Sequence, residues 1–114
     1  MNKEFIPYQQ ALELKELGFD EDVFEWFDTE TKDFCDVMKE VKAPLFQQSF
    51  RWFREKYNLH PHFFLQPDST YVWCIRWFEG GRQKDIPYFP SNTYEEAELD
   101  CLNKLIEIVK GGKL

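Results

Sequence analysis

The sequence predicts a small α+β fold, with an antiparallel sheet and packed helices. Three segments have helical spacing of apolar residues, and short β-prone segments lie between them. The predicted order is α-(ββ)-α-β-β-β-α, where the bracketed pair is a hairpin. A chain of 114 residues fits one domain. We therefore expect a single domain over 1–114, with a helix and an acidic hairpin in 1–43 and an α-β-β-β-α unit in 44–110.

The first helix is expected over residues 7–17. Pro7 suits the first helical position, because its missing N–H would have no partner there. Gly18 follows the last apolar residue of the pattern and can adopt the positive φ that ends many helices.

Residues 19–43 allow two interpretations. The β-prone segment 23–27 precedes a turn-like acidic segment 28–31, which favours a hairpin with 34–41 as the second strand. The apolar residues near 34–41 also recur with a helical period, which favours a short helix over 32–41 instead.

The second helix is predicted to begin at Pro44 and to end at Asn58, a residue that tolerates a left-handed cap. One aromatic stripe follows its buried side. The stripe consists of Phe46, Phe50, Phe53 and Tyr57.

Strands are expected over 62–66, 70–79 and 83–88. The middle strand has apolar residues on both faces, as in a strand that is covered twice or lies centrally. Gly80 and Gly81 predict a tight hairpin turn. The last helix begins with the capping box Thr93 to Glu96, in which side chain and main chain bond reciprocally.

Composition bounds the setting of the protein. Three cysteines without a CxxC spacing argue for a reducing compartment. The N-terminus lacks the apolar run of a signal peptide, and no apolar stretch is long enough for a membrane span. We expect a cytoplasmic protein with no membrane contact. No sequence feature indicates the oligomeric state.

The net charge of −7 is unevenly distributed. Residues 1–43 contain 5 Lys/Arg against 12 Asp/Glu, whereas residues 44–92 contain 6 against 4. Residues 44–110 share their element order with double-stranded-RNA-binding domains. Those domains place basic residues at the start of the last helix, where residues 94–98 here are largely acidic and would repel phosphate. The sequence therefore argues against duplex RNA as a partner.

No catalytic, metal or cofactor motif is apparent. His60 and His62 lack a third ligand, which metal sites usually need. The cysteines lack a neighbouring base, so nucleophilic catalysis is not indicated. The sequence predicts a protein that is not an enzyme.

Two candidate binding sites remain. A small anionic ligand, a nucleotide or a nucleic acid would suit arginines beside stacking tryptophans. The residues predicted for this site are Arg51, Arg54, Arg76, Trp73, Trp77 and Lys84. A protein partner would suit the aromatic residues inside the acidic stretch. The residues predicted for that site are Phe24, Trp26, Asp22 and Glu25.

Three stretches carry a resemblance to known sequences. They are residues 7–20 (PYQQALELKELGFD), residues 44–57, which end in FRWFREKY, and residues 93–110, which begin TYEEAEL. Together they resemble a family of small uncharacterised proteins of Bacteroidota phages and integrated mobile elements. The resemblance implies a cytoplasmic, phage-related setting. For that setting we expect a non-enzymatic accessory protein that binds a host or phage protein. The resemblance implies no activity, and a counter-defence protein that sequesters a nucleotide would fit the same setting.

Overall fold

The computed structural model of the chain describes residues 4–28, 30–34 and 41–111. Its helices and two antiparallel sheets confirm the predicted α+β class and element order. The chain divides into two compact units, residues 1–49 (unit 1) and 50–114 (unit 2). The boundary lies inside helix α2 (Phe46–Tyr57) rather than at its start.

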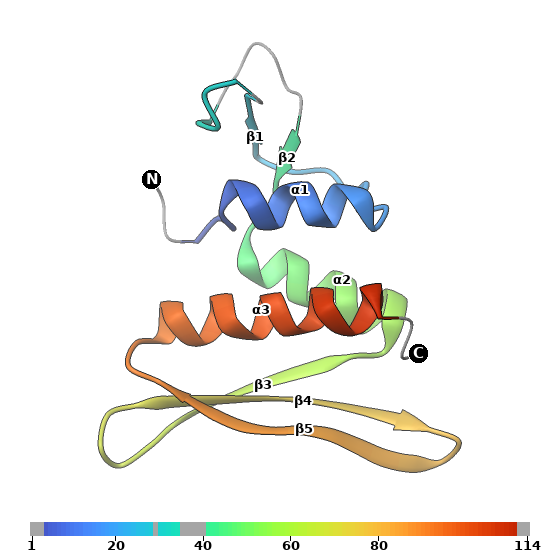
Figure 1. The fold of residues 1–114 in the computed structure, drawn as a ribbon, viewed down its shortest axis with the longest axis vertical. Helices are drawn as coiled ribbons and strands as arrows, with labels where there is room; N and C mark the ends of the chain where they lie inside the picture. Colours follow the sequence, from blue (N-terminus) through green and yellow to red (C-terminus); the bar gives the residue numbers. More distant parts are fainter. Residues whose placement is uncertain (1–3, 29, 35–40, 112–114) are drawn as a thin grey trace. The chain divides into compact units, whose positions relative to one another are not determined.

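Unit 1 contains α1 (Tyr8–Glu16) and a two-stranded sheet of β1 (Glu25–Phe27) and β2 (Val41–Ala43) (Figure 1). Helix α1 ends where the sequence predicts. Gly18 has a φ of +97°, and the amides of Gly18 and Phe19 donate to the carbonyls of Lys15 and Leu14 at 3.1 and 2.9 Å. This pattern is a Schellman motif, which satisfies two of the last carbonyls of the helix.

A hairpin forms in residues 19–43. Its second strand, β2, begins at Val41, the last residue of the predicted strand 34–41, and residues 35–40 lie outside the described residues. Trp26 pairs with Lys42, and Phe27 pairs with Val41. Phe34 makes only an isolated bridge to Phe27. The predicted alternative, a helix over 32–41, lies mostly outside the described residues.

An aromatic cluster explains why Phe34 lies against β1. The ring of Phe27 stacks on that of Phe34, with 5.0 Å between centroids, and meets the edge of Tyr8 at 5.5 Å. Phe5 contacts Phe34 at 5.3 Å. Offset and edge-on ring pairs of this kind stabilise a small core beyond the area that they bury, and Phe27 is fully buried.

Helix α2 begins at Phe46, two residues later than Pro44 would suggest. The reason is an extended pairing with the N-terminal segment. The Ile6 amide donates to the Pro44 carbonyl at 3.0 Å, and the Phe46 amide donates to the Glu4 carbonyl at 2.8 Å. At the other end, Asn58 adopts the predicted left-handed conformation, with a φ of +55°.

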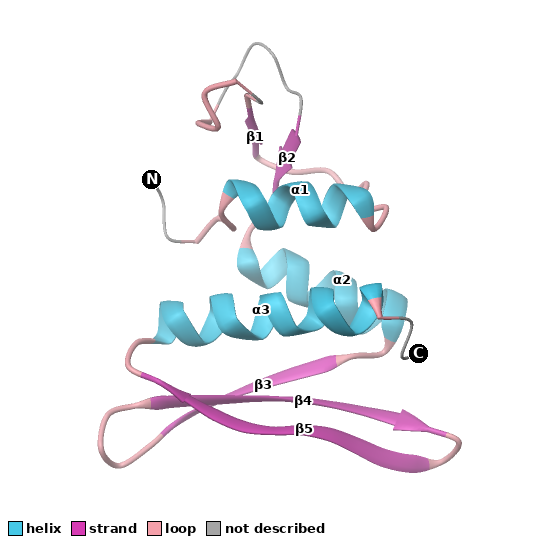
Figure 2. Ribbon diagram, in the orientation of Figure 1, coloured by secondary structure: helices cyan, strands magenta, loops and turns pink. Residues whose placement is uncertain are grey.

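Unit 2 contains an antiparallel sheet in the order β3-β4-β5 (Figure 2). The strands are β3 (His60–Leu65), β4 (Tyr71–Glu79) and β5 (Arg82–Ser91). Gly80 and Gly81 both have positive φ and form the predicted two-residue turn. The register of β5 shifts by one residue opposite Cys74, and Pro87 lies at this irregularity of an edge strand, where proline is tolerated.

Helix α3 (Tyr94–Lys110) lies along one face of that sheet (Figure 1). Thr93 is its N-cap, and the Thr93 hydroxyl accepts a hydrogen bond from the Glu96 amide at 3.1 Å. The Glu96 carboxylate accepts from the Asn92 amide at 3.3 Å. The return bond of the capping box thus reaches one residue further back than the sequence predicts.

Candidate functional site

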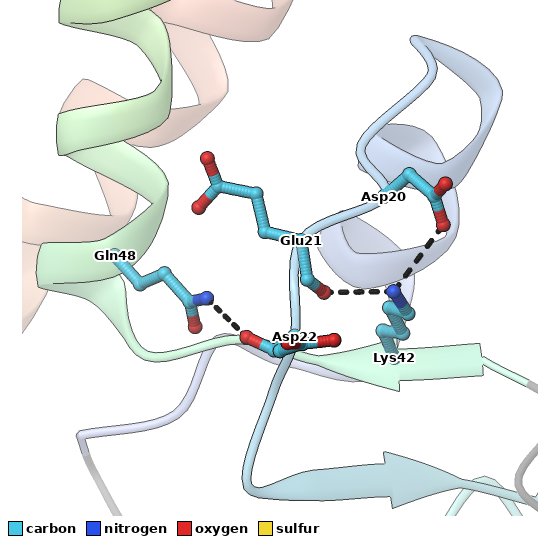
Figure 3. Close-up of polar contacts among 5 residues, drawn as sticks. All are labelled: Asp20, Glu21, Asp22, Lys42 and Gln48. Atoms are coloured by element: carbon cyan, nitrogen blue, oxygen red, sulfur yellow. Dashed lines mark hydrogen bonds and ion pairs between the residues drawn. The ribbon is translucent and has the colours of Figure 1, made fainter.

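Residues 20–25 form a short acidic segment between the end of α1 and β1, and four of these six residues are Asp or Glu. Most of the segment has no helix or strand conformation. Two side chains from elsewhere in unit 1 bond to its main chain instead, as Figure 3 shows. We call this stretch the acidic segment.

Lys42 of β2 is the first of these side chains. Its ammonium donates to the Glu21 carbonyl at 2.8 Å and to the Asp20 carboxylate at 3.3 Å (Figure 3). It also lies over the ring of Trp26, its cross-strand partner, 5.6 Å from the centroid. Because only 20% of the Lys42 side chain is exposed, these contacts replace much of the water that an ammonium group needs.

Gln48, in the first turn of α2, is the second side chain that bonds to the main chain of the acidic segment. Its side-chain amide donates to the Asp22 carbonyl at 2.6 Å (Figure 3). The carbonyls of Glu21 and Asp22 are therefore both held by side chains, which fixes the path of the main chain between them. A segment fixed in this way loses little conformational entropy when it binds a partner.

The four residues predicted for protein binding all lie in or beside the acidic segment. Phe24 is 81% exposed, the highest value among the large apolar residues that the structure describes. Asp22 is exposed, and Glu25 and Trp26 are half-buried. The structure therefore places an exposed phenylalanine beside carboxylates in the acidic segment.

The six residues predicted for anion binding do not converge. Tyr71 of β4 contacts Tyr94 of α3 at 5.5 Å, which identifies the helix-facing side of the sheet. Trp73 and Trp77 alternate with Tyr71 on this side and are 4% and 9% exposed. Arg76 lies on the opposite side, so the strand tryptophans and Arg76 do not line one pocket.

Arg76 is instead paired with its cross-strand neighbour. Its guanidinium donates to the Asp85 carboxylate at 2.9 Å, and the Gln83 side chain donates to the same carboxylate at 3.0 Å. The bond from Gln83, and then that from Arg76, lowers the pKa of Asp85 below its ordinary value. The charge of Arg76 is therefore balanced within the sheet.

The remaining cations predicted for this ligand site are surface residues. Arg51 and Arg54 are exposed on α2, and Arg51 approaches Glu55 at 3.7 Å. Lys84 is exposed on β5 opposite Trp77.

The two histidines contact neighbouring side chains, and the two cysteines that the structure describes are buried. His60 shares a hydrogen bond of 2.7 Å with the Asn58 side chain, and His62 stacks on Phe64. Cys74 and Cys101 are buried, and burial raises the pKa of the Cys101 thiol far above its ordinary value.

Within residues 4–28, 30–34 and 41–111, no group of three or more potential ligands could hold a metal ion. Cys35 lies outside the described residues.

Comparison of the chain with protein-family models, curated proteins and solved structures gives no match. Among the described helices, none has the length and apolar character needed to cross a membrane.

Sequence reasoning missed the two residues that hold the acidic segment. Lys42 lies 21 residues from Glu21, and Gln48 lies 26 residues from Asp22. Neither separation corresponds to a helical or strand repeat, and Gln48 lies outside the aromatic stripe that the sequence predicts for α2. No local pattern marked Lys42, because a lysine between Val41 and Ala43 in a strand points to the opposite face from these two side chains and is ordinarily solvated there.

Proposed function

We propose that this protein is a non-enzymatic interaction module, and that the acidic segment of unit 1 binds a basic surface on a host or phage protein. The observation that carries the proposal is Phe24, 81% exposed beside Asp22 and Glu25. An exposed aromatic ring gives a contact its apolar centre, and the surrounding carboxylates select a basic partner. The phage or mobile-element setting is part of the proposal and rests on the sequence resemblance.

The distribution of charge between the two units also favours a basic partner for unit 1. Residues 1–49 carry 5 Lys/Arg and 12 Asp/Glu, whereas residues 50–114 carry 9 of each. The whole net charge of −7 therefore lies in unit 1. A surface with this excess attracts basic partners over roughly a Debye length, about 8 Å at physiological salt.

Capture of partners from host lysate with matched variants of the full chain tests the proposal. Phe24→Ser removes the apolar centre, and Asp22→Lys reverses one charge while leaving the carbonyl that Gln48 contacts. Phe78→Ser is the control, because Phe78 is 58% exposed in unit 2. We expect one protein with a basic surface to be retained by the wild type and by the control, and to fall at least fivefold with either unit 1 variant, since about 1 kcal/mol of lost contact corresponds to that factor.

Retention of the partner protein is also expected to depend on the salt concentration. Raising the salt concentration from 50 to 500 mM is expected to release the same protein, because screening shortens the reach of surface charges. Equal retention by all variants at both salt concentrations would show that the acidic segment is not the interaction surface.

A further inference from the structure

Unit 1 contains a cavity of about 200 Å³ beside the acidic segment. It lies between the second half of α1, the residues that follow it, and the paired strands β1 and β2. Its lining residues are Ala11, Lys15, Phe19, Asp20, Trp26 and Lys42. The cavity belongs to one unit and has both apolar and charged walls, as binding sites for small molecules have.

The cavity is partly open to solvent, and its volume suits an occupant with one ring. A cavity of about 150 Å³ lined by apolar residues holds a benzene molecule, so 200 Å³ leaves room for a ring and a small substituent. The rings of Phe19 and Trp26 supply an aromatic wall, against which a planar ring packs favourably.

The side chains that line the cavity carry a net charge of +1, in contrast to the negative charge of unit 1 as a whole. Two of its lining residues are lysines and one is an aspartate. The Lys42 ammonium already meets the Asp20 carboxylate at 3.3 Å. The Lys15 ammonium is exposed and makes no ion pair with any residue that the structure describes. Lys15 therefore accounts for the excess positive charge among the residues that line the cavity.

The same contacts argue against a cationic ligand. One of the two faces of the Trp26 ring is covered by the Lys42 ammonium at 5.6 Å, so that face is closed to a second cation. A cationic ligand would be repelled by both lysines that line the cavity. A neutral ring would gain the aromatic contacts alone.

We propose that this cavity binds a small planar carboxylate, with its ring against Trp26 and Phe19 and its carboxylate on the Lys15 ammonium. The proposal does not rest on the protein-binding role of the acidic segment, although Asp20 belongs to that segment and also lines the cavity.

Benzoate titration of the full chain, followed by the indole N–H signals in two-dimensional ¹H–¹⁵N NMR at constant ionic strength, tests this proposal. We expect a saturable shift of the Trp26 signal that exceeds those of the three tryptophans of unit 2. Benzamide and benzylamine, which have similar size but no negative charge, are expected to bind at least fivefold more weakly.

Lysine variants give the residue-level control. Lys15→Gln is expected to weaken benzoate binding about fivefold, which corresponds to an exposed charge contact of about 1 kcal/mol, and Lys15→Arg is expected to retain it. Lys104→Gln, which removes the same charge from α3 of unit 2, is expected to have no effect. Equal binding of benzoate and benzamide, an unchanged affinity in Lys15→Gln, or no saturable shift of Trp26 would each overturn the proposal.

Discussion

Lys42 and Trp26 are directly opposite each other on paired strands, and the ammonium of one lies 5.6 Å from the ring centroid of the other. The same ammonium donates to the Glu21 carbonyl at 2.8 Å. One lysine thus connects the hairpin to the acidic segment. The conformation of the segment and the shape of the neighbouring cavity both depend on this side chain.

Lys42→Met is expected to destabilise unit 1 by about 1.5–3 kcal/mol, because a hydrogen bond that involves a charged group contributes about that much. The matched control is Lys32→Met. The Lys32 ammonium also lies over an aromatic ring, that of Tyr8 at 5.8 Å, but it makes no hydrogen bond to a described residue. Its loss is expected to cost at most about 1 kcal/mol, the upper value for an exposed cation–π contact.

Urea unfolding followed by amide signals of each unit measures both lysine variants, because the two units need not unfold together. An equal effect of Lys42→Met and Lys32→Met would show that the bonds to the acidic segment contribute no stability.

Two glycines provide a second comparison. Gly18 has a φ of +97° at the end of α1, whereas Gly111 has a φ of −76° at the end of α3. Gly18→Ala is expected to lower the free energy of unfolding by about 1–2 kcal/mol, because a Cβ is strained at positive φ. Gly111→Ala is expected to change it by less than about 0.5 kcal/mol. Thermal unfolding of both variants checks the prediction, and a smaller loss for Gly18→Ala than for Gly111→Ala would contradict the Schellman assignment.

The Asp85 carboxyl is expected to titrate below its ordinary pKa, because Gln83 and then Arg76 donate hydrogen bonds to its ionised form. Its contribution to stability is then fully present above the pKa of the unfolded chain and is lost as the pH falls through the lower folded value. Carbon-detected NMR of the side-chain carboxyl measures this pKa directly. Gln83→Leu is expected to raise it, and an unchanged value in that variant would contradict the bond.

Local sequence signals predicted the elements whose causes are local. The Schellman end at Gly18, the left-handed Asn58, the turn at Gly80 and Gly81, and the Thr93 cap each depend on residues a few positions apart. The start of α2 was misplaced, because the pairing of Ile6 with Pro44 and of Glu4 with Phe46 is non-local.

For the candidate sites too, local features could be predicted from the sequence and non-local groupings could not. The position of Phe24 in an acidic stretch was readable from the sequence, and the structure adds that it is exposed. The anion site failed as a geometric grouping because the alternation of β4 places Arg76 and Trp77 on opposite faces. The cavity could not be predicted, because Lys15, Trp26 and Lys42 come together only through the hairpin register and the end of α1.

Site-specific photo-crosslinking tests the central claim most directly. The photoreactive residue p-benzoylphenylalanine replaces Phe24 in one full-length variant and Phe78 in another, and both are irradiated in host lysate. We predict one protein adduct from position 24 that is absent from position 78, is lost at 500 mM salt, and contains a basic surface at the crosslinked site. No adduct from position 24, or the same adduct from both positions, would contradict the assignment of the acidic segment as the interaction surface.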